Sequence, residues 1–508
     1  MALTAANQNT SQQEHQLKRR TGKPWMLLIT NAFYLLLVFG WTVGNKPTGK
    51  DFAALTRPDL LGAVTGRLFS AMIAAFSTHC WLYYLTNLLL LYLCMVLILI
   101  LCRVLGRGPW WLGSVAAVLF MAHPLKTEAV LTLSGIQFLL PTVCALLLLL
   151  LYTRCRDSAS TLVRWLPPVA YLALILSFPD MIPLFLVLII LDFCFYRKRE
   201  HAKPVLWAIF IIGISAFLIS GQWAVQGAWL PDKIVLSLFL IVYPIGMLPD
   251  TIAFFANHLL ITTLCFILFL YLMTRLLRNI KDPLVTFGVL ATFAFHLLQG
   301  GEAVDPVHLS GSGRMVMLLA LFALSLGSMF HVFMRSERWR STVVRNSTLL
   351  CVAAMLSQGW VNWHWRQAGL DVQSFQETAQ QTVEQHPGQW IGLLPNISYV
   401  GTVPLMYSQA IRYDTPFSRA LPVQSLLELP VLPSAAVKIE EYNTDSFEVY
   451  VSNPALPKFS IPKRLTRAWW YQRHRPQEEA LFRRDAKNVP FPILRIPPHK
   501  ARLIDFQP

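Results

Sequence analysis

The stretch "LYYLTNLLLLYLCMVLILILC" at residues 82–102 carries no charged side chain. One helical crossing of a bilayer needs about 20 consecutive apolar residues, so this run predicts a transmembrane helix. The whole chain of 508 residues has the same character, because 55% of it is hydrophobic, 14% is charged and the mean hydropathy is +0.48. An ordinary soluble domain is about 25% charged. The sequence therefore predicts an α-helical polytopic membrane protein.

Further apolar runs on both sides of this stretch bring the number of predicted spans to eleven. They lie near residues 25–43, 82–102, 109–122, 131–152, 165–178, 181–195, 205–221, 255–274, 284–299, 314–333 and 343–358. One more apolar segment, 233–249, is interrupted by Pro244 and Gly246. We interpret it as a re-entrant or interfacial helix, because broken backbone at membrane depth is tolerated only against protein or a water-filled cavity.

The basic residues of the loops predict the orientation. With a cytoplasmic N-terminus, twenty Lys and Arg residues fall in cytoplasmic loops, and seven fall outside: Lys46, Lys50, Arg57, Arg67, Lys126, Lys233 and Arg314. Cytoplasmic loops are the ones enriched in Lys and Arg, so this count places the C-terminus outside and the protein in a cell (inner) membrane. The net charge of +16 is spread in small groups between apolar runs, which does not favour nucleic-acid binding.

Three regions follow from this topology. Residues 1–20 form a disordered cytoplasmic tail, 21–359 the transmembrane domain, and 360–508 a small extracytoplasmic domain that we expect to be α+β. In the last region, 374–386 has a helical pattern, and 436–453 has the alternation of two strands joined by a short turn. The eight cysteines all precede residue 360, so the outer domain is not a disulfide scaffold.

Polar residues collect in the predicted outer loops, where charge next to hydrocarbon is costly and marks a functional hypothesis. A site built there could bind phosphate through Arg and Lys and activate a hydroxyl through a carboxylate. Each residue alone could equally cap a helix or solvate a loop. The candidates are Asp51, Asp59, Arg67, His123, Lys126, Glu128, Asp180, His308 and Arg314.

The segment "HPLKTEAVLTLSG" (123–135) resembles the His-Pro-x-x-Thr-Glu-Ala-Val…Gly motif of the transmembrane, TPR-containing O-mannosyltransferases and their bacterial relatives in the GT-C glycosyltransferase superfamily. Other segments resemble motifs of that family in the same order along residues 25–365. They are "RPDLL" (57–61), "GRLFS" (66–70), "YYLTNLLLLYL" (83–93), "LSFPDMIPLFLVLIILD" (176–192), "LSLFLIVYPIGMLPD" (236–250) and "HLSGSG" (308–313).

The resemblance implies a membrane glycosyltransferase that transfers a hexose from a polyprenyl-phosphate donor to an extracytoplasmic glycan, lipid or protein acceptor. The transfer inverts the configuration of the anomeric carbon. By position, Asp51 is the nearest match to the family's catalytic base, and Asp59 is the next carboxylate. Arg67 corresponds to the Arg of the family's Tyr-Arg-Pro-Leu motif, and His123, Thr127 and Glu128 match the second motif. Some GT-C enzymes use a divalent metal, although no tight carboxylate pair here argues for one.

Several motif charges are replaced in this chain. Only Asp51 stands near the family's paired first-loop acids, and the Gly-Arg-x-Asp sequence becomes Gly135, Ile136, Gln137 and Phe138. The TPR repeats are absent. Two readings stay open: a divergent transferase, or a catalytically inactive GT-C-like protein that binds a lipid-linked glycan or partners in polysaccharide export. A transporter is disfavoured by the scarcity of mid-span charges and of inverted repeats.

Overall fold

The structure is a computed structural model. It describes residues 24–106, 110–156, 158–196, 203–220, 282–299, 312–334 and 337–385, scattered positions between 241 and 275, and the strand residues between 391 and 495. The tail 1–20, nearly all of segment 233–249, half of segment 255–274, and His308 lie outside the described residues.

The described chain is dominated by helices. Its α-helices are α2 (Pro24–Phe39), α3 (Gly49–Thr56), α4 (Ala63–Phe76), α5 (Cys80–Gly106), α6 (Trp110–Ala122), α7 (Thr127–Leu131), α8 (Ile136–Cys155), α9 (Thr161–Ser177), α10 (Leu184–Tyr196), α11 (Lys203–Ile219), α15 (Pro283–Leu298), α16 (Val316–Met334) and α17 (Glu337–Gln385). Short 3-10 turns join several of them: η1 (Gly40–Gly44), η2 (Pro58–Leu61), η3 (Pro124–Lys126), η4 (Leu133–Gly135), η5 (Pro179–Met181) and η8 (Ser312–Met315).

Length and composition identify the helices that could cross a membrane. Among the described residues five qualify: Pro24–Gly44, Cys80–Gly106, Leu133–Cys155, Pro179–Tyr196 and Ser312–Met334. A sixth is counted if Trp110–Ala122 and Pro124–Leu131, which meet at a 60° bend, form one span. Three further predicted spans, 165–178, 205–221 and 284–299, correspond to shorter apolar helices. The protein is thus a multi-pass helical membrane protein, and the count of eleven spans stays a prediction.

Helix α5 is the centre of the bundle, since it contacts α2, α6, α8 and α16. Glycines let the helices approach closely. A Cβ atom on Gly113 of α6 would lie 2.6 Å from the Leu99 carbonyl oxygen of α5, and one on Gly288 of α15 would lie 2.8 Å from the Leu321 carbonyl oxygen of α16. Small residues at helix contacts are typical of membrane bundles, where close packing replaces the hydrophobic effect.

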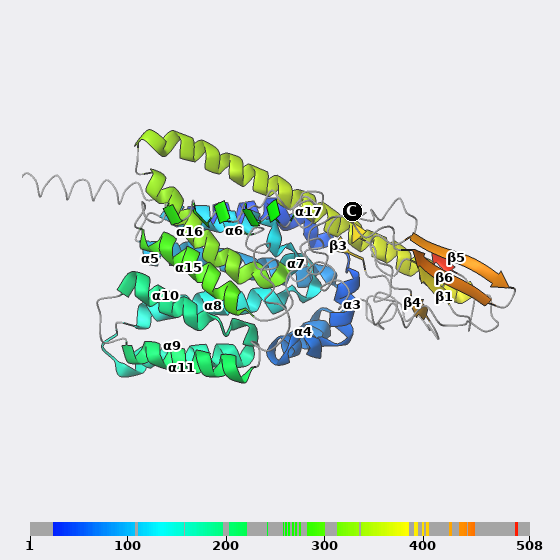
Figure 1. The fold of residues 1–508 in the computed structure, drawn as a ribbon, viewed down its shortest axis with the longest axis horizontal. Coiled ribbons are helices and arrows are strands. Elements are labelled where there is room, and N and C mark those ends of the chain that lie inside the picture. Colours follow the sequence, from blue (N-terminus) through cyan, green and yellow to red (C-terminus); the bar gives the residue numbers. More distant parts are fainter. Residues whose placement is uncertain are drawn as a thin grey trace, which may run out of the picture.

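The predicted span 343–358 and the predicted helix 374–386 belong to one helix, α17. Its 49 residues reach about 73 Å at 1.5 Å per residue, far more than the roughly 30 Å of a hydrocarbon core. Figure 1 shows α17 running along the bundle and continuing toward the strands. Helix α17 is not among the helices that are apolar enough to count as a span.

Strands follow α17. Strand β1 (Ile391–Leu394) pairs in parallel with β4 (Leu426–Glu428) and β7 (Ile493–Arg495). Strands β2 (Tyr399–Val400) and β3 (Val403–Pro404) form an antiparallel pair that contacts α17. Strands β5 (Ala436–Asn443) and β6 (Ser446–Ser452) form the hairpin predicted from the alternation at 436–453.

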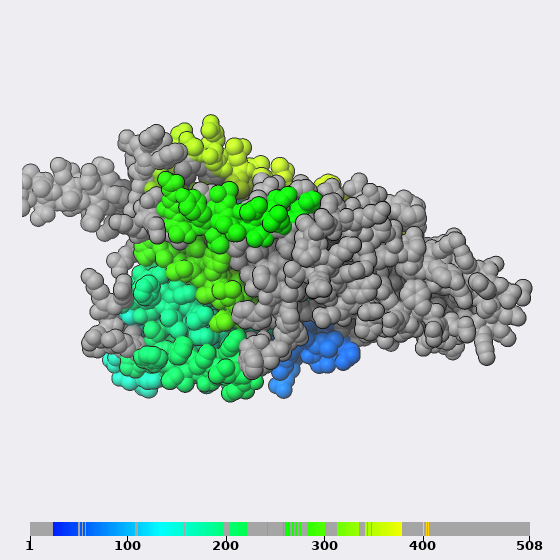
Figure 2. All heavy atoms as spheres, viewed as in Figure 1, coloured from blue at the N-terminus to red at the C-terminus, as the bar shows by residue number. Residues whose placement is uncertain are grey.

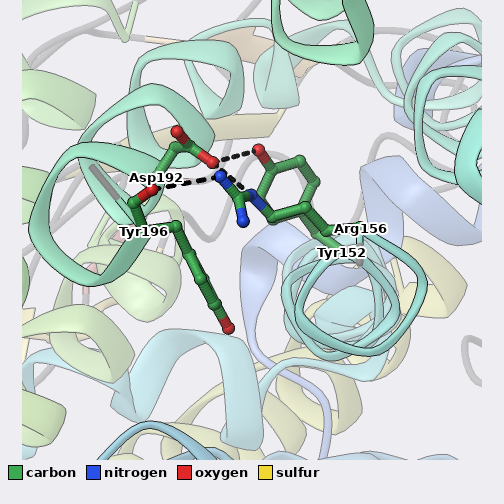
Figure 3. A network of polar contacts seen from close by, with 4 residues as sticks. All are labelled: Tyr152, Arg156, Asp192 and Tyr196. Atoms are coloured by element: carbon green, nitrogen blue, oxygen red, sulfur yellow. Dashed lines mark hydrogen bonds and ion pairs between the residues drawn. The ribbon is translucent and has the colours of Figure 1, made fainter. Parts of the chain in front are cut away.

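A partly buried ion pair joins the end of α8 to α10 (Figure 3). The Arg156 Nε atom lies 2.5 Å from Asp192 Oδ1, which also accepts a hydrogen bond of 2.8 Å from the Tyr152 hydroxyl. The Arg156 side chain is fully buried, and its guanidinium lies 4.2 Å from the centre of the Tyr196 ring. Because desolvated charges are costly when unpaired, this contact fixes the register of the two helices.

Large apolar side chains stay exposed on the outer helices. On α11, Trp207 is 62% exposed and Ile211 is 58% exposed, and this helix lies on the face shown in Figure 2. Helix α4 lies on the same face and exposes Leu68. Apolar surface of this extent on a multi-pass protein is the surface that lipid tails cover.

Candidate functional site

The loop between α6 and α8 folds back into the helical bundle instead of projecting outward. It contains η3, α7 and η4, and nearly all of residues 121–135 are buried. The His123 Nδ1 atom accepts a hydrogen bond of 3.2 Å from the Leu125 N–H, so the ring is neutral and Nε2 donates to the Ile241 carbonyl at 2.9 Å. Pro124 begins the η3 turn, where its missing N–H is not needed. We call residues 123–135 the buried loop.

Lys126 is completely buried inside this loop. Its ammonium donates to the carbonyl oxygens of Met121 and, at 2.8 Å, His123, which end helix α6. It also lies 5.1 Å from the centre of the Phe39 ring. An amine at this position donates to carbonyl oxygens at the helix C-terminus that have no partner within the helix. These contacts join Lys126 to the end of α6 and to α2, and the role toward the membrane surface or the donor phosphate stays a prediction.

Asp51 joins the first loop to the buried loop. Its Oδ2 accepts hydrogen bonds from the Thr48 N–H at 2.8 Å and the Thr48 hydroxyl at 3.1 Å, as in a capping box at the start of α3. Its Oδ1 accepts the Leu133 N–H at 2.7 Å. The side chain has no exposed surface. These bonds make Asp51 a connection between two loops that are far apart in the sequence.

Asn87 makes the same kind of connection from α5. Its Nδ2 donates to the carbonyl oxygens of Thr132 at 2.7 Å and Val130 at 3.3 Å. Gly135 permits this approach, because a Cβ atom there would lie 2.0 Å from the Ala129 carbonyl oxygen and 2.6 Å from Asn87 Nδ2. Motif segments 83–93 and 123–135 therefore meet in space.

We expect Gly135→Ala to destabilise the protein by about 1–3 kcal/mol or more, because a backbone oxygen cannot move aside as a flexible side chain can. The measurement is the thermal transition of the purified full chain in detergent. Gly359→Ala is the matched control, since nothing lies within 4 Å of its added Cβ atom. Equal transition temperatures for the two variants would contradict the prediction.

Glu128 connects the buried loop to the η8 turn. Its Oε2 accepts hydrogen bonds from the Gly313 N–H at 3.0 Å and the Ser312 hydroxyl at 3.4 Å. Arg314 follows directly, and its buried Nη1 atom has no hydrogen-bond partner among the described residues. A buried unpaired guanidinium nitrogen next to a fixed turn is suited to an anionic oxygen.

Phe138 packs against the η8 turn. A Cβ atom on Gly313 would lie 2.4 Å from the Phe138 ring, so the ring lies directly on this glycine. The contact between the start of α8 and η8 is therefore apolar.

Asp59 and Arg67 lie on neighbouring elements and are both exposed. Asp59 is in η2, and Arg67 is in the first turns of α4. Gly66 brings these elements together, since its added Cβ atom would lie 2.5 Å from the Pro58 carbonyl oxygen. The segments 57–61 and 66–70 are thus in contact, and each carries one exposed charged residue.

The remaining candidates are less connected. Asp180 is exposed in η5, and none of its described contacts leads to the buried loop. His308 lies outside the described residues. Among the residues that the structure describes, no group of three or more His, Cys, Asp or Glu side chains could hold a metal ion.

Sequence reasoning missed Asn87, Gln358 and Asn362, which all hydrogen-bond within the buried polar network. The signal was present, because each is a polar residue in or beside an apolar run. Such residues are costly in a membrane unless they pair with a partner.

No family model matches the chain, and no curated protein matches it. Solved structures of the arabinofuranosyltransferase AftD from Mycobacteria are similar at 14% identity, with TM-scores of 0.39 for one structure and 0.37 and 0.36 for two of a variant. The match covers 81% of this chain, which spans about a third of the length of AftD. Likeness at this level carries no argument about activity.

Proposed function

We propose that the chain is an integral membrane glycosyltransferase. In this proposal it transfers a sugar from a polyprenyl-phosphate-linked donor to an extracytoplasmic glycan, lipid or protein. We propose that the chain crosses the membrane eleven times with a cytoplasmic N-terminus. The α+β domain of residues 360–508 then lies outside, on the same side as the buried loop. We also propose the division into a cytoplasmic tail, a transmembrane domain and an outer domain.

The observation that carries the proposal is the convergence of the motif segments. Asp51 from the first loop, Asn87 from segment 83–93, and Ser312 and Gly313 from segment 308–313 all hydrogen-bond to residues 123–135. These segments resemble motifs of one glycosyltransferase family in sequence order. Their contacts support a common site, because unrelated local resemblances have no reason to meet in space.

The reaction needs a base and a partner for the leaving phosphate. We assign the base to Asp59, which is exposed, and a loop-positioning role to Asp51, whose oxygens are bonded to Thr48 and Leu133. The base takes the proton of the acceptor hydroxyl as its oxygen attacks the anomeric carbon, and the bond to the polyprenyl phosphate breaks. Arg314 and Arg67 would neutralise the departing phosphate.

A second candidate function rests on a specific observation. His123, Lys126, Glu128 and Asp51 are all bonded to other parts of the protein. A buried polar network that is fully engaged in structure also suits a GT-C-like protein that no longer catalyses and instead binds a lipid-linked glycan or takes part in polysaccharide export.

Binding of undecaprenyl phosphate to the purified full chain tests the donor part of the proposal. We expect Arg314→Met to raise the Kd by roughly 10- to 100-fold, because a hydrogen bond to a charged group contributes about 1.5–3 kcal/mol. Arg345→Met is the control, since Arg345 is exposed on α17 in the predicted cytoplasmic part. No binding by the wild-type chain, or equal Kd values for the two variants, would overturn the assignment of Arg314.

A further inference from the structure

Helix α17 contacts the buried loop through two amide side chains, Gln358 and Asn362, which have no exposed surface. The Gln358 Oε1 atom accepts a hydrogen bond of 3.5 Å from the Lys126 ammonium. Its Nε2 atom donates to the Thr127 hydroxyl at 2.8 Å and to Asn362 Oδ1 at 2.6 Å. Every polar atom of the Gln358 side chain therefore has a partner, and the partners fix the direction of the amide.

The network continues to a third element. The Asn362 Nδ2 atom donates to the Val38 carbonyl oxygen at 2.9 Å, near the end of α2. Phe39, the next residue, has its ring below the Lys126 ammonium. A closed set of contacts thus joins α2, the buried loop and α17, although α17 lies more than 200 residues from the other two elements in the sequence.

We propose that Gln358 and Asn362 are positioning residues that fix the buried loop against α17. This inference rests on the proposed glycosyltransferase function for its effect on catalysis. Lys126 is enclosed and bonded to carbonyl oxygens, so it acts on the site through the shape of the loop, and Gln358 sets that shape. The outer end of α17 contacts β2 and β3, so the same helix couples the extracytoplasmic region to the loop.

The geometry explains why amides occupy these positions. Lys126 needs an acceptor, whereas Thr127 already donates its hydroxyl proton to the Pro124 carbonyl and needs a donor. A carboxylate would meet the first need and fail the second, and an apolar side chain would fail both. Glutamine supplies an acceptor and two donors from one side chain.

Hydrogen exchange of the full chain in detergent tests the positioning role without any assay of activity. We expect Gln358→Met, and likewise Asn362→Leu, to raise exchange at residues 123–131 by about tenfold or more, with little change in α8. Gln373→Met is the matched control, because Gln373 lies on the same helix and its amide donates to Glu377 at 3.1 Å, away from the buried loop. Exchange at 123–131 that equals the control, or that rises equally in every helix, would overturn the proposal.

Kinetics separate positioning from general destabilisation. In transfer from polyprenyl-phosphate mannose or glucose, Gln358→Met should lower kcat by about tenfold or more and leave the donor KM within a few fold. In a Lys126→Met background the same substitution should have little further effect, because the two residues act as a unit. Additive losses would overturn the coupling. If the wild-type chain transfers no sugar, the proposed function fails, and the exchange experiment still decides the positioning role.

Discussion

Asp59→Asn should lower the rate of sugar transfer by about 10²- to 10⁴-fold, the usual effect of losing a general base. The substitution keeps the size of the side chain and removes its ability to accept a proton. Asp59 is exposed, and its backbone contacts within η2 do not involve the carboxylate, so we expect the variant to fold normally. The measurement is the rate of sugar transfer from polyprenyl-phosphate mannose or glucose in membranes. It is combined with a complementation test, in which the variant must restore the glycan of cells that lack the protein.

Asp51→Asn is the informative comparison for that variant. An amide at residue 51 would place an NH₂ group against the N–H of either Thr48 or Leu133, which leaves one buried donor unpaired. We expect this to cost about 1–3 kcal/mol of stability. The thermal transition should therefore fall for Asp51→Asn and stay unchanged for Asp59→Asn.

The outcomes of the two variants decide between the readings. A well-folded, inactive Asp51→Asn beside a fully active Asp59→Asn would assign the base to Asp51, as the motif position first suggested. Full activity of both single variants and of their combination would exclude a first-loop base. That result would favour the lipid-linked glycan-binding protein.

Asp192→Asn has the second large expected effect, on stability. It removes the carboxylate that pairs with the buried Arg156 guanidinium, and losing one partner of a fully buried pair costs about 3–5 kcal/mol, an upper value here because the Asp192 side chain is 15% exposed. We expect a marked fall in the amount of membrane-inserted protein and in the thermal transition of the purified full chain.

A double substitution is the control for this prediction. Replacing both partners with apolar residues of similar size, as in Arg156→Met with Asp192→Leu, is often neutral or stabilising because no unpaired charge remains. The double variant should therefore recover most of the lost stability. A double variant as unstable as Asp192→Asn would show that the ion pair is not the cause.

The helical membrane architecture could be predicted from single apolar runs. Residues 82–102 and 314–333 are long enough and free enough of charge that each corresponds to a span-length helix in the structure. The alternation at 436–453 was likewise sufficient to predict the β5–β6 hairpin. Local patterns succeed at such places because hydrophobic length and strand periodicity are properties of the segment itself.

Continuity between elements could not be predicted. The sequence predicts a span at 343–358 and a separate helix at 374–386, yet both belong to α17. No proline interrupts residues 337–385, and backbone hydrogen bonding continues through the change of environment. Where α17 leaves the bundle, its amino-acid composition changes, but its helical backbone continues.

The sequence by itself determined that this is a multi-pass helical protein and that the polar residues of segment 123–135 are unusual. Only the tertiary structure decided what those residues contact. Lys126 and Asp51 look like surface charges in a predicted loop, but both are enclosed and bonded to backbone groups. The physical reason is that a buried polar group is stable only with a partner, and the partners here come from α5, η8 and α17, far away in the chain.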